Sequence, residues 1–278
     1  MKLTVLVDNN TFIDQYLIGE PGVCYFIECD GNKILFDTGY SDVFLKNSQV
    51  LRIDLSTLDY IVLSHGHNDH TWGLNHLTQY YDRLNHNPEK KIKLICHPDA
   101  LISKYYDSKP IGINYRLEEN DFFFTKMSTL KPLYLSEHVI FLGQIPRRNS
   151  FESAKPIGYT CNCTGEESDD YVLDDSALVV KTSNGLVIIT GCSHAGVINI
   201  IEYAREITGE ENIISVIGGF HLQNADDSVL SKTGEYLKSL ATDLLYPCHC
   251  TDLAAKIFLS GYVKVNEVGV GLSIKFPV

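Results

Sequence analysis

The chain has 278 residues, of which 44% are hydrophobic and 21% are charged, and its formal net charge at pH 7 is −12. The hydrophobic share allows a substantial core and excludes an intrinsically disordered chain. The acidic balance repels phosphate backbones, so we expect no nucleic-acid partner, and an anionic small-molecule substrate would need a local positive centre.

The sequence favours a cytoplasmic location. No apolar run approaches the roughly 18 residues that a membrane span needs, so no membrane association is expected. The first residues, MKLTVLVDNNTF, lack the basic segment followed by an apolar one that marks a secretion signal. The eight cysteines are therefore expected to be reduced. No feature of the sequence indicates an oligomeric state.

The N-terminal half is predicted to hold strands followed by strand–helix units. Alternating residues predict a strand at Lys2–Val7, then strands at Cys24–Glu28 and Lys33–Phe36 joined by a hairpin around Asp30-Gly31. Further along, the pattern predicts a short helix at Ser41–Asn47, an apolar strand at Tyr60–Leu63, a helix at Trp72–Arg83 and a strand at Ile92–Cys96.

The C-terminal half repeats this order after a long irregular stretch, Pro146–Asp170, which we predict to be a lid or binding loop. The predicted elements are a hairpin of Ala177–Lys181 and Leu186–Thr190, helices at Ile198–Ile207 and Ser228–Ala241, and strands at Ile213–Ile217, Leu244–Tyr246 and Leu272–Phe276. This order fits an α/β fold of the αββα type, with two mixed sheets face to face and helices outside. We expect a single domain over residues 1–278.

The strongest functional signal is a dense His-x-His-x-Asp-His motif directly after an apolar strand. It comprises His65, His67, Asp69 and His70, and Gly66 permits the tight turn that brings them together. Imidazole nitrogen combined with carboxylate oxygen suits zinc, and also iron, cobalt or manganese. A polar loop with incidental histidines is the alternative, but the density of the spacing argues against it.

Three more histidines stand where predicted strands end. His194, His221 and His249 follow the strands Leu186–Thr190, Ile213–Ile217 and Leu244–Tyr246. Because the carboxyl ends of neighbouring parallel strands meet at one rim, we expect these side chains to converge with the first motif. His97 also follows a predicted strand but gives a weaker signal.

The cysteines divide into two kinds. Cys161-x-Cys163 and Cys248-x-Cys250 lack the Cys-x-x-Cys spacing of structural zinc sites, so we interpret them as small buried residues rather than ligands. Cys192 differs, because it stands two residues before His194 at a strand end. It is either a metal ligand or a group that supports one.

Three cations of the Pro146–Asp170 stretch are candidate substrate-binding residues. Arg147, Arg148 and Lys155 could hold phosphate oxygens, although solvated loop charges are an equal alternative.

The order of these motifs resembles the metallo-β-lactamase superfamily over essentially the whole chain. Phe36-Asp37-Thr38-Gly39 precedes the histidine motif, and Thr190-Gly191-Cys192 and a late His249 follow it. The segments Gly218-Gly219-Phe220-His221-Leu222 and Tyr246-Pro247-Cys248-His249-Cys250-Thr251 are similar to the subfamily of 7,8-dihydropterin-6-yl-methyl-4-(β-D-ribofuranosyl)aminobenzene 5′-phosphate synthases. The resemblance implies a metallo-β-lactamase fold with a two-metal active site.

The chain departs from the usual superfamily pattern at two ligand positions. No histidine stands at the usual interval before Thr190-Gly191, and Cys192 replaces the usual aspartate. We therefore expect His194 to take the missing histidine's role and Cys192 to occupy the bridging position. Asp37 is expected to orient a ligand imidazole. The expected metal ligands are His65, His67, Asp69, His70, Cys192, His194 and His249, and the expected catalytic residues are Asp69 and His221.

The resemblance implies an enzyme with two divalent transition-metal ions, zinc in the first place, with manganese or iron as alternatives. The favoured activity is hydrolysis of a phosphorylated or otherwise anionic small molecule. A dihydropterin diphosphate-dependent transferase and a non-catalytic metal-binding sensor are the alternatives.

Overall fold

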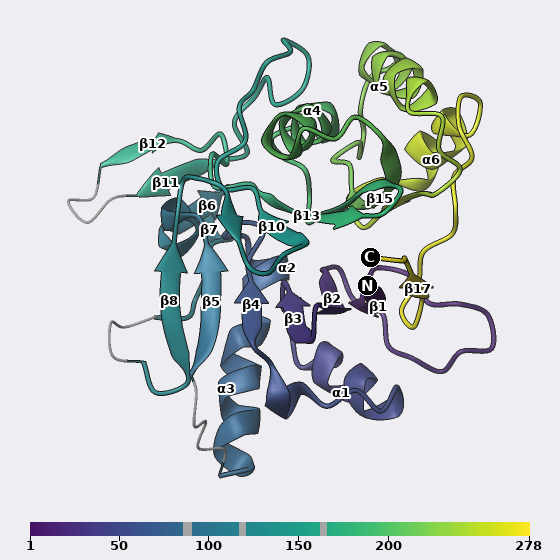
Figure 1. Ribbon diagram of the computed structural model, residues 1–278. Helices are drawn as coiled ribbons and strands as arrows, with labels where there is room; N and C mark the ends of the chain where they lie inside the picture. Colours follow the sequence, from purple (N-terminus) through teal and green to yellow (C-terminus); the bar gives the residue numbers. More distant parts are fainter. Residues whose placement is uncertain (86–90, 117–120, 162–165) are drawn as a thin grey trace.

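The computed structural model describes residues 1–85, 91–116, 121–161 and 166–278, and two large sheets form its centre (Figure 1). The first sheet has the strand order β17-β1-β2-β3-β4-β5-β8. It is mixed, because β17, β1, β2 and β3 pair antiparallel whereas β3, β4, β5 and β8 pair parallel. Its strands are β1 (Lys2–Val7), β2 (Cys24–Cys29), β3 (Asn32–Phe36), β4 (Tyr60–Val62), β5 (Ile92–Cys96), β8 (Phe124–Ser128) and β17 (Ser273–Lys275).

The second sheet has the order β16-β15-β14-β13-β10-β9 and is also mixed. The pairs β14·β15 and β15·β16 are parallel, and the remaining pairs are antiparallel. Its strands are β9 (Leu133–Tyr134), β10 (Val139–Phe141), β13 (Ala177–Thr182), β14 (Gly185–Thr190), β15 (Ile213–Gly219) and β16 (Leu245–Cys248).

The inner faces of the two sheets share one apolar core. Leu3 and Ile27 of the first sheet belong to the same buried cluster as Val187 and Ile189 of the second. Side chains alternate between faces along each strand, so Phe26, the neighbour of Ile27, instead joins the cluster on the outer face of the first sheet. The sheets therefore lie face to face.

Helices cover both outer faces. α1 (Val43–Val50) and α3 (Gly73–Arg83) contribute Phe44 and Leu77 to the cluster on the outer face of the first sheet. On the other side, α4 (Val197–Thr208), α5 (Asp227–Ser239) and α6 (Leu253–Leu259) contribute Ile201, Leu237 and Leu259 to the cluster against the second sheet. The predicted αββα architecture is confirmed. Shorter helical segments are α2 (Asn68–Thr71), η1 (Leu55–Thr57) and η2 (Pro98–Leu101).

A third, small sheet was not predicted. Its order is β12-β11-β6-β7, with bounds β6 (Ser103–Tyr106), β7 (Lys109–Pro110), β11 (Tyr159–Cys161) and β12 (Glu167–Asp169). Two of these strands fall inside the predicted irregular stretch Pro146–Asp170, which is therefore partly a β-hairpin. Cys163 lies outside the described residues. In the described ranges, no helix has the length and apolar character needed to cross a membrane.

Candidate metal centre

The histidine motif runs from the loop after β4 into α2, and hydrogen bonds hold the backbone around it. The carboxylate of Asp37 accepts hydrogen bonds from the Ser64 backbone N–H and hydroxyl, both at 2.7 Å. The Gly66 N–H donates to Asp174 at 2.7 Å. A Cβ at Gly66 would lie 2.4 Å from the Ala100 carbonyl oxygen, so only glycine fits this turn. The loop is thereby fixed before any ligand binds.

Three histidines form the first donor group, and they come from the segments that follow β4 of the first sheet and β14 of the second. His65, His67 and His194 have ring nitrogens within 4.8 Å of one another, and all three side chains are buried. The His65 Nε2 and His67 Nδ1 atoms lie only 3.0 Å apart. Within the described chain, His67 Nε2 and both ring nitrogens of His194 have no hydrogen-bond partner. Buried nitrogens without partners are costly, and a bound cation would satisfy them.

Burial keeps these imidazoles neutral. It lowers the pKa of His67 to about 4 and holds the pKa values of His65 and His194 well below the ordinary value of histidine. A neutral imidazole has one nitrogen with a free lone pair, which is the form that ligates a metal. The first group therefore fits a transition-metal ion without further deprotonation.

Asp69, His70 and His249 form the second donor group, again within 4.8 Å of one another. His249 Nε2 lies 3.3 Å from Asp69 Oδ2. Asp37 Oδ2 is 2.7 Å from His70 Nδ1, and Asn9 Oδ1 is 3.0 Å from His249 Nδ1. Both outer oxygens accept from Nδ1, which leaves the Nε2 atoms of both rings to face the centre. The structure thus places Asp37 where the sequence predicted, behind a candidate ligand.

His70 behaves differently from the buried histidines of the first group. Burial alone would lower its pKa, but Asp69 and Asp37 raise the pKa of His70 to about 9. In the metal-free chain both ring nitrogens of His70 are therefore protonated at neutral pH, and the ring is positively charged. A metal ion that binds His70 must displace one of these protons.

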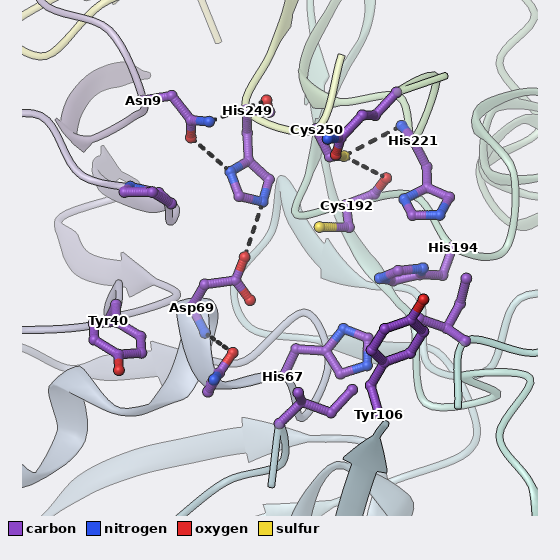
Figure 2. A pocket seen from close by; sticks show the side chains of 15 residues that line it. Asn9, Tyr40, His67, Asp69, Tyr106, Cys192, His194, His221, His249 and Cys250 are labelled. Carbon is purple, nitrogen blue, oxygen red and sulfur yellow. Dashed lines mark hydrogen bonds and ion pairs between the residues drawn. The ribbon is translucent and has the colours of Figure 1, made fainter. Parts of the chain in front are cut away.

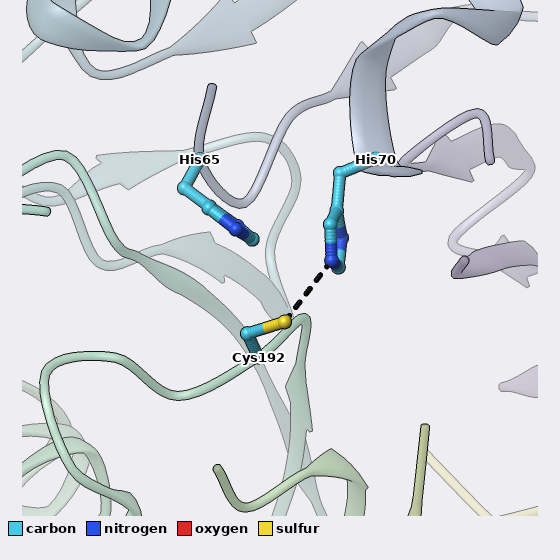
Figure 3. A group of neighbouring side chains, drawn as sticks. All are labelled: His65, His70 and Cys192. Atoms are coloured by element: carbon cyan, nitrogen blue, oxygen red, sulfur yellow. Dashed lines mark hydrogen bonds between the residues drawn. The ribbon is translucent and has the colours of Figure 1, made fainter. Parts of the chain in front are cut away.

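Cys192 lies between the two donor groups. Its Sγ is 3.1 Å from His70 Nε2, and His65, His70 and Cys192 form a further group within 4.8 Å (Figure 3). Cys250, which the sequence analysis interpreted as a core residue, forms a fourth such group with Cys192 and His249. The signal for Cys250 was its position beside His249 at a strand end. Cys248 does pack in the core, with its Sγ 3.2 Å from the Tyr25 hydroxyl.

These groups lie at one cavity of about 770 Å³ (Figure 2). His221 lines it, and its ring centroid is 4.2 Å from that of His194, although His221 is in none of the donor groups found among the described residues. The described lining includes no lysine or arginine. It comprises Asn9, Pro21, Tyr40, His67, Asn68, Asp69, Tyr106, Ile111, Ile157, Cys192, His194, His221, Gln223, His249 and Cys250.

The two arginines predicted to bind phosphate lie outside the described cavity lining. Arg147 donates from its guanidinium to the carbonyl oxygens of Tyr171 and Val172, and Arg148 forms an ion pair with Glu206 on α4. Neither lines the cavity, because local backbone and helix acceptors already engage both side chains.

Lys155, unlike the two arginines, belongs to the lining of a cavity. It lines an adjoining cavity of about 320 Å³ that shares His194 and His221 with the larger one. His97 instead caps the start of η2, because its Nδ1 accepts a hydrogen bond from the Asp99 backbone N–H at 3.0 Å.

The fold and these donors together define a class of protein. Two facing mixed sheets carry imidazole, carboxylate and thiol groups from both halves of the chain to one buried cluster, and these donors suit divalent transition metals. The cluster fits metal ions, since its orphaned nitrogens lie beside further donors. The chain is therefore an αββα sandwich protein with a candidate metal centre at one edge of its facing sheets.

The chain belongs to the metallo-β-lactamase superfamily. The model of the family described as "Metallo-beta-lactamase superfamily" matches residues 17–129. The "Uncharacterized protein MJ0448" of Methanocaldococcus jannaschii is 33% identical over 93% of this chain and 93% of its own length. From the same organism, "7,8-dihydropterin-6-methyl-4-(beta-D-ribofuranosyl)-aminobenzene-5'-phosphate synthase" is 29% identical over 99% of this chain and 97% of its own.

A solved structure of similar sequence extends the likeness to three dimensions. The structure of Tm1679, described as a metal-dependent hydrolase of the β-lactamase superfamily, has a TM-score of 0.84 and 29% identity, and each chain is covered to 100%. The predicted family resemblance is therefore confirmed, for both the superfamily and the similarity to the synthase.

Proposed function

We propose that the protein is a dinuclear metal-dependent hydrolase of a small molecule that carries a phosphate or another anionic group. The observation that carries this proposal is the adjacency of the His65–His67–His194 and Asp69–His70–His249 groups, with Cys192 between them, at one cavity. Two divalent ions held there would polarise a substrate phosphoryl or carbonyl oxygen and balance its charge. Zinc suits these donors, with manganese and iron as alternatives.

The absence of lysine and arginine from the described cavity lining supports an anion site that depends on metal. With a net charge of −12, the protein as a whole repels anions. Neutral donors remain for orientation, namely the side-chain amides of Asn9 and Gln223 at the cavity wall. We therefore expect the metal-free protein to bind anionic substrates very weakly.

His221 is proposed as the general acid. Its ring lies against that of His194 at the cavity, outside the donor groups, so it is free to give a proton to a leaving group. Its backbone has φ of 50°, in the left-handed region, two residues after Gly219. Asp69, whose two oxygens lie near His70 and His249, is proposed to hold the second ion and to order both rings.

Apolar side chains of the cavity indicate the other part of the substrate. Tyr40, which stacks on Trp72 with ring centroids 4.9 Å apart, and Tyr106, Ile111 and Ile157 line the wall. A flat, weakly polar group would pack well against such a surface. The proposed substrate is therefore an anionic group attached to a ring system.

A transferase is the second candidate function. It is favoured by the relative named as a dihydropterin-linked synthase, which is 29% identical over 99% of this chain. In such a reaction, an incoming amine would displace a diphosphate leaving group, and His221 and the metal centre would keep their proposed positions. The alternative of a non-catalytic sensor predicts the same metal binding without turnover.

A substrate panel separates these functions. Zinc-loaded protein would be incubated with phosphodiesters, thioesters, lactams, and a dihydropterin diphosphate with and without an aromatic amine acceptor. Hydrolysis of a phosphoester supports the proposal, whereas diphosphate release that requires the amine supports the transferase. If no compound is turned over by protein with full metal content, the enzyme proposal fails.

Metal content and two variants test the centre itself. Elemental analysis of protein purified without chelator should give two ions per chain, because the donors exceed the needs of one. His67→Ala and Asp69→Ala should each abolish turnover while far-ultraviolet circular dichroism stays nearly unchanged, since His67 precedes the one-turn helix α2 and Asp69 lies within it, both outside the sheets. Near-normal turnover in either variant would show that these residues are misassigned.

A further inference from the structure

Cys250 and Cys192 face each other at the side of the centre that includes His249. Cys192 stands two residues after the end of β14, and Cys250 stands two residues after the end of β16. The Sγ atoms of both cysteines and a His249 ring nitrogen all lie within 4.8 Å of one another. Both cysteines also line the cavity (Figure 2), so a metal ion can reach their sulfur atoms.

The Cys250 sulfur is held in a position built for it. The His221 backbone N–H donates to Cys250 Sγ at 3.3 Å, and the thiol donates to the Cys192 carbonyl oxygen, also at 3.3 Å. A Cβ at Gly219 would lie 2.5 Å from this sulfur, so the glycine leaves the room that Sγ occupies. His249 has φ of 50°. The left-handed backbone at His249 and the glycine at the end of β15 together leave the Cys250 thiol room beside Cys192.

Cys192 connects this pair to the rest of the centre. Its Sγ is 3.1 Å from His70 Nε2, and the same sulfur belongs to the group with His65 and His70. The position bounded by Asp69, His70 and His249 is therefore flanked by two sulfur atoms, while the three-histidine position has at most one. The two halves of the centre differ in chemical softness.

We propose that Cys250 is a metal ligand and that, with Cys192, it makes the Asp69–His70–His249 position a sulfur-bearing site. Such a site prefers zinc or cobalt, which accept thiolate, over manganese or magnesium, which prefer oxygen. The inference rests on the metal-binding part of the proposed function, and it does not depend on the substrate. It also implies that the two positions bind different metals with different strength.

Cobalt substitution tests this proposal without an activity assay. Metal-free wild type, Cys250→Ser, Cys192→Ser and the control Cys161→Ser would be titrated with Co²⁺ while absorption is recorded. Cys161 is a partly buried cysteine of β11 outside the donor groups. Sulfur-to-cobalt charge-transfer absorption should appear in the wild type and the control, and about half of it should be lost in each of the other variants.

Metal competition and thiol protection provide second readouts if a variant folds poorly. In wild-type protein, Zn²⁺ should protect both Cys192 and Cys250 from alkylation, identified by mass spectrometry, whereas Mn²⁺ should protect neither. In Cys250→Ser, the preference for Zn²⁺ over Mn²⁺ should fall by about tenfold or more.

The outcomes distinguish failure of the Cys250 proposal from failure of the proposed metal centre as a whole. Failure of the wild type to bind Co²⁺ would overturn both. Cobalt binding with unchanged charge-transfer absorption in Cys250→Ser, or alkylation of Cys250 at full zinc occupancy, would overturn the sulfur-bearing site alone. A Cys192–Cys250 disulfide that forms equally fast with and without Zn²⁺ would also contradict it, since ligated sulfur resists oxidation.

Discussion

Asp37 connects the backbone of the histidine loop to a candidate ligand. One carboxylate accepts from the Ser64 N–H, from the Ser64 hydroxyl and from His70 Nδ1, and all three distances are 2.7 Å. The residue has φ of 57°, which aspartate and asparagine tolerate better than most residues. Its position fixes the orientation of the His70 ring relative to the centre.

We predict that Asp37→Asn weakens zinc binding by about 10- to 100-fold, the usual effect of removing a carboxylate behind a ligand histidine. The amide keeps the size and the backbone conformation but loses the charge that the His70 Nδ1–H faces. Competition with a chromophoric chelator would measure the affinity. Asp42→Asn, at the exposed start of α1, is the matched control and should bind zinc as the wild type does. Equal affinities in both variants would remove Asp37 from the centre.

Lys104 is a buried cation at the back of the same loop. It is 1% exposed, and its Nζ lies 2.9 Å from Asp170 and 2.8 Å from Asp174, whose other oxygen accepts from Gly66. Burial alone would lower its pKa, but the two carboxylates raise it, so the amine stays charged. The ion pair of Lys104 with Asp174 connects β6 of the small sheet to the histidine loop at Gly66.

We predict that Lys104→Met lowers the free energy of unfolding by about 3–5 kcal/mol, because it leaves two buried carboxylates without a counter-charge. Urea-induced unfolding measures the change. Lys109→Met, an exposed site on β7, should cost less than about 0.5 kcal/mol. Removing one of the two uncompensated charges with Asp170→Asn in the Lys104→Met background should recover part of the loss. A cost below about 1 kcal/mol for Lys104→Met would show that water reaches the carboxylates.

Individual residues differ in how far the sequence determines their place. The motif His65 to His70 is predictable because its spacing is local, and His194 and His249 are predictable because strand ends meet at one rim. Cys250 was missed, since a free cysteine is usually a core residue, as its neighbour Cys248 is, and its position beside His249 at a strand end was given too little weight. The position of Arg147 was not predictable, because the carbonyl oxygens that it binds depend on a loop path that no local pattern encodes.

At the scale of elements, the small sheet forms part of the wall of the main cavity. Tyr106 ends β6, and Ile157 precedes β11, and both line the main cavity. The pairing of β6 with β11 holds these two side chains in a common wall. The sheet therefore shapes the cavity, although none of its described residues belongs to a donor group.

We predict that Tyr106→Ala raises KM roughly 2- to 10-fold for the substrate that the panel identifies, the range for loss of one aromatic contact. The kcat and the metal content should stay close to the wild-type values. Tyr134→Ala, an exposed tyrosine of β9, should change neither constant. A fall in kcat with unchanged KM would contradict a role in ground-state binding.

The long strands and helices were predictable, whereas the strands of the small sheet were not. β1, β14 and α4 follow regular apolar periods over six or more residues. β6 has the sequence SKYY, in which the buried position is a lysine, so the polar pattern hides the strand. The stability of β6 depends on Asp170 and Asp174, which lie more than 60 residues away. Local sequence does not contain that information.

For the whole molecule, the fold does not rest on the metal. Three apolar clusters hold the sheets and helices together, and the donor loops lie at their edge. We predict that chelation leaves far-ultraviolet circular dichroism unchanged but lowers the midpoint of thermal unfolding. With free zinc at 100 times its Kd, each bound ion contributes about 2.7 kcal/mol, or roughly 5–10 °C in a chain of this size. His67→Ala should show a smaller shift, and an unfolded metal-free protein would contradict this view.

The candidate ligands come from both halves of the chain, and this has a consequence for biosynthesis. His65 to His70 emerge from the ribosome well before His249 and Cys250. At usual rates of translation the interval is roughly 10–35 s. During that time the nascent chain presents three imidazoles and a carboxylate without the second sheet that completes the centre. If the centre binds metal as proposed, an ion captured then would have too few ligands to be discriminated by softness, and exchange after the C-terminal strands have docked would be needed to select the final metal.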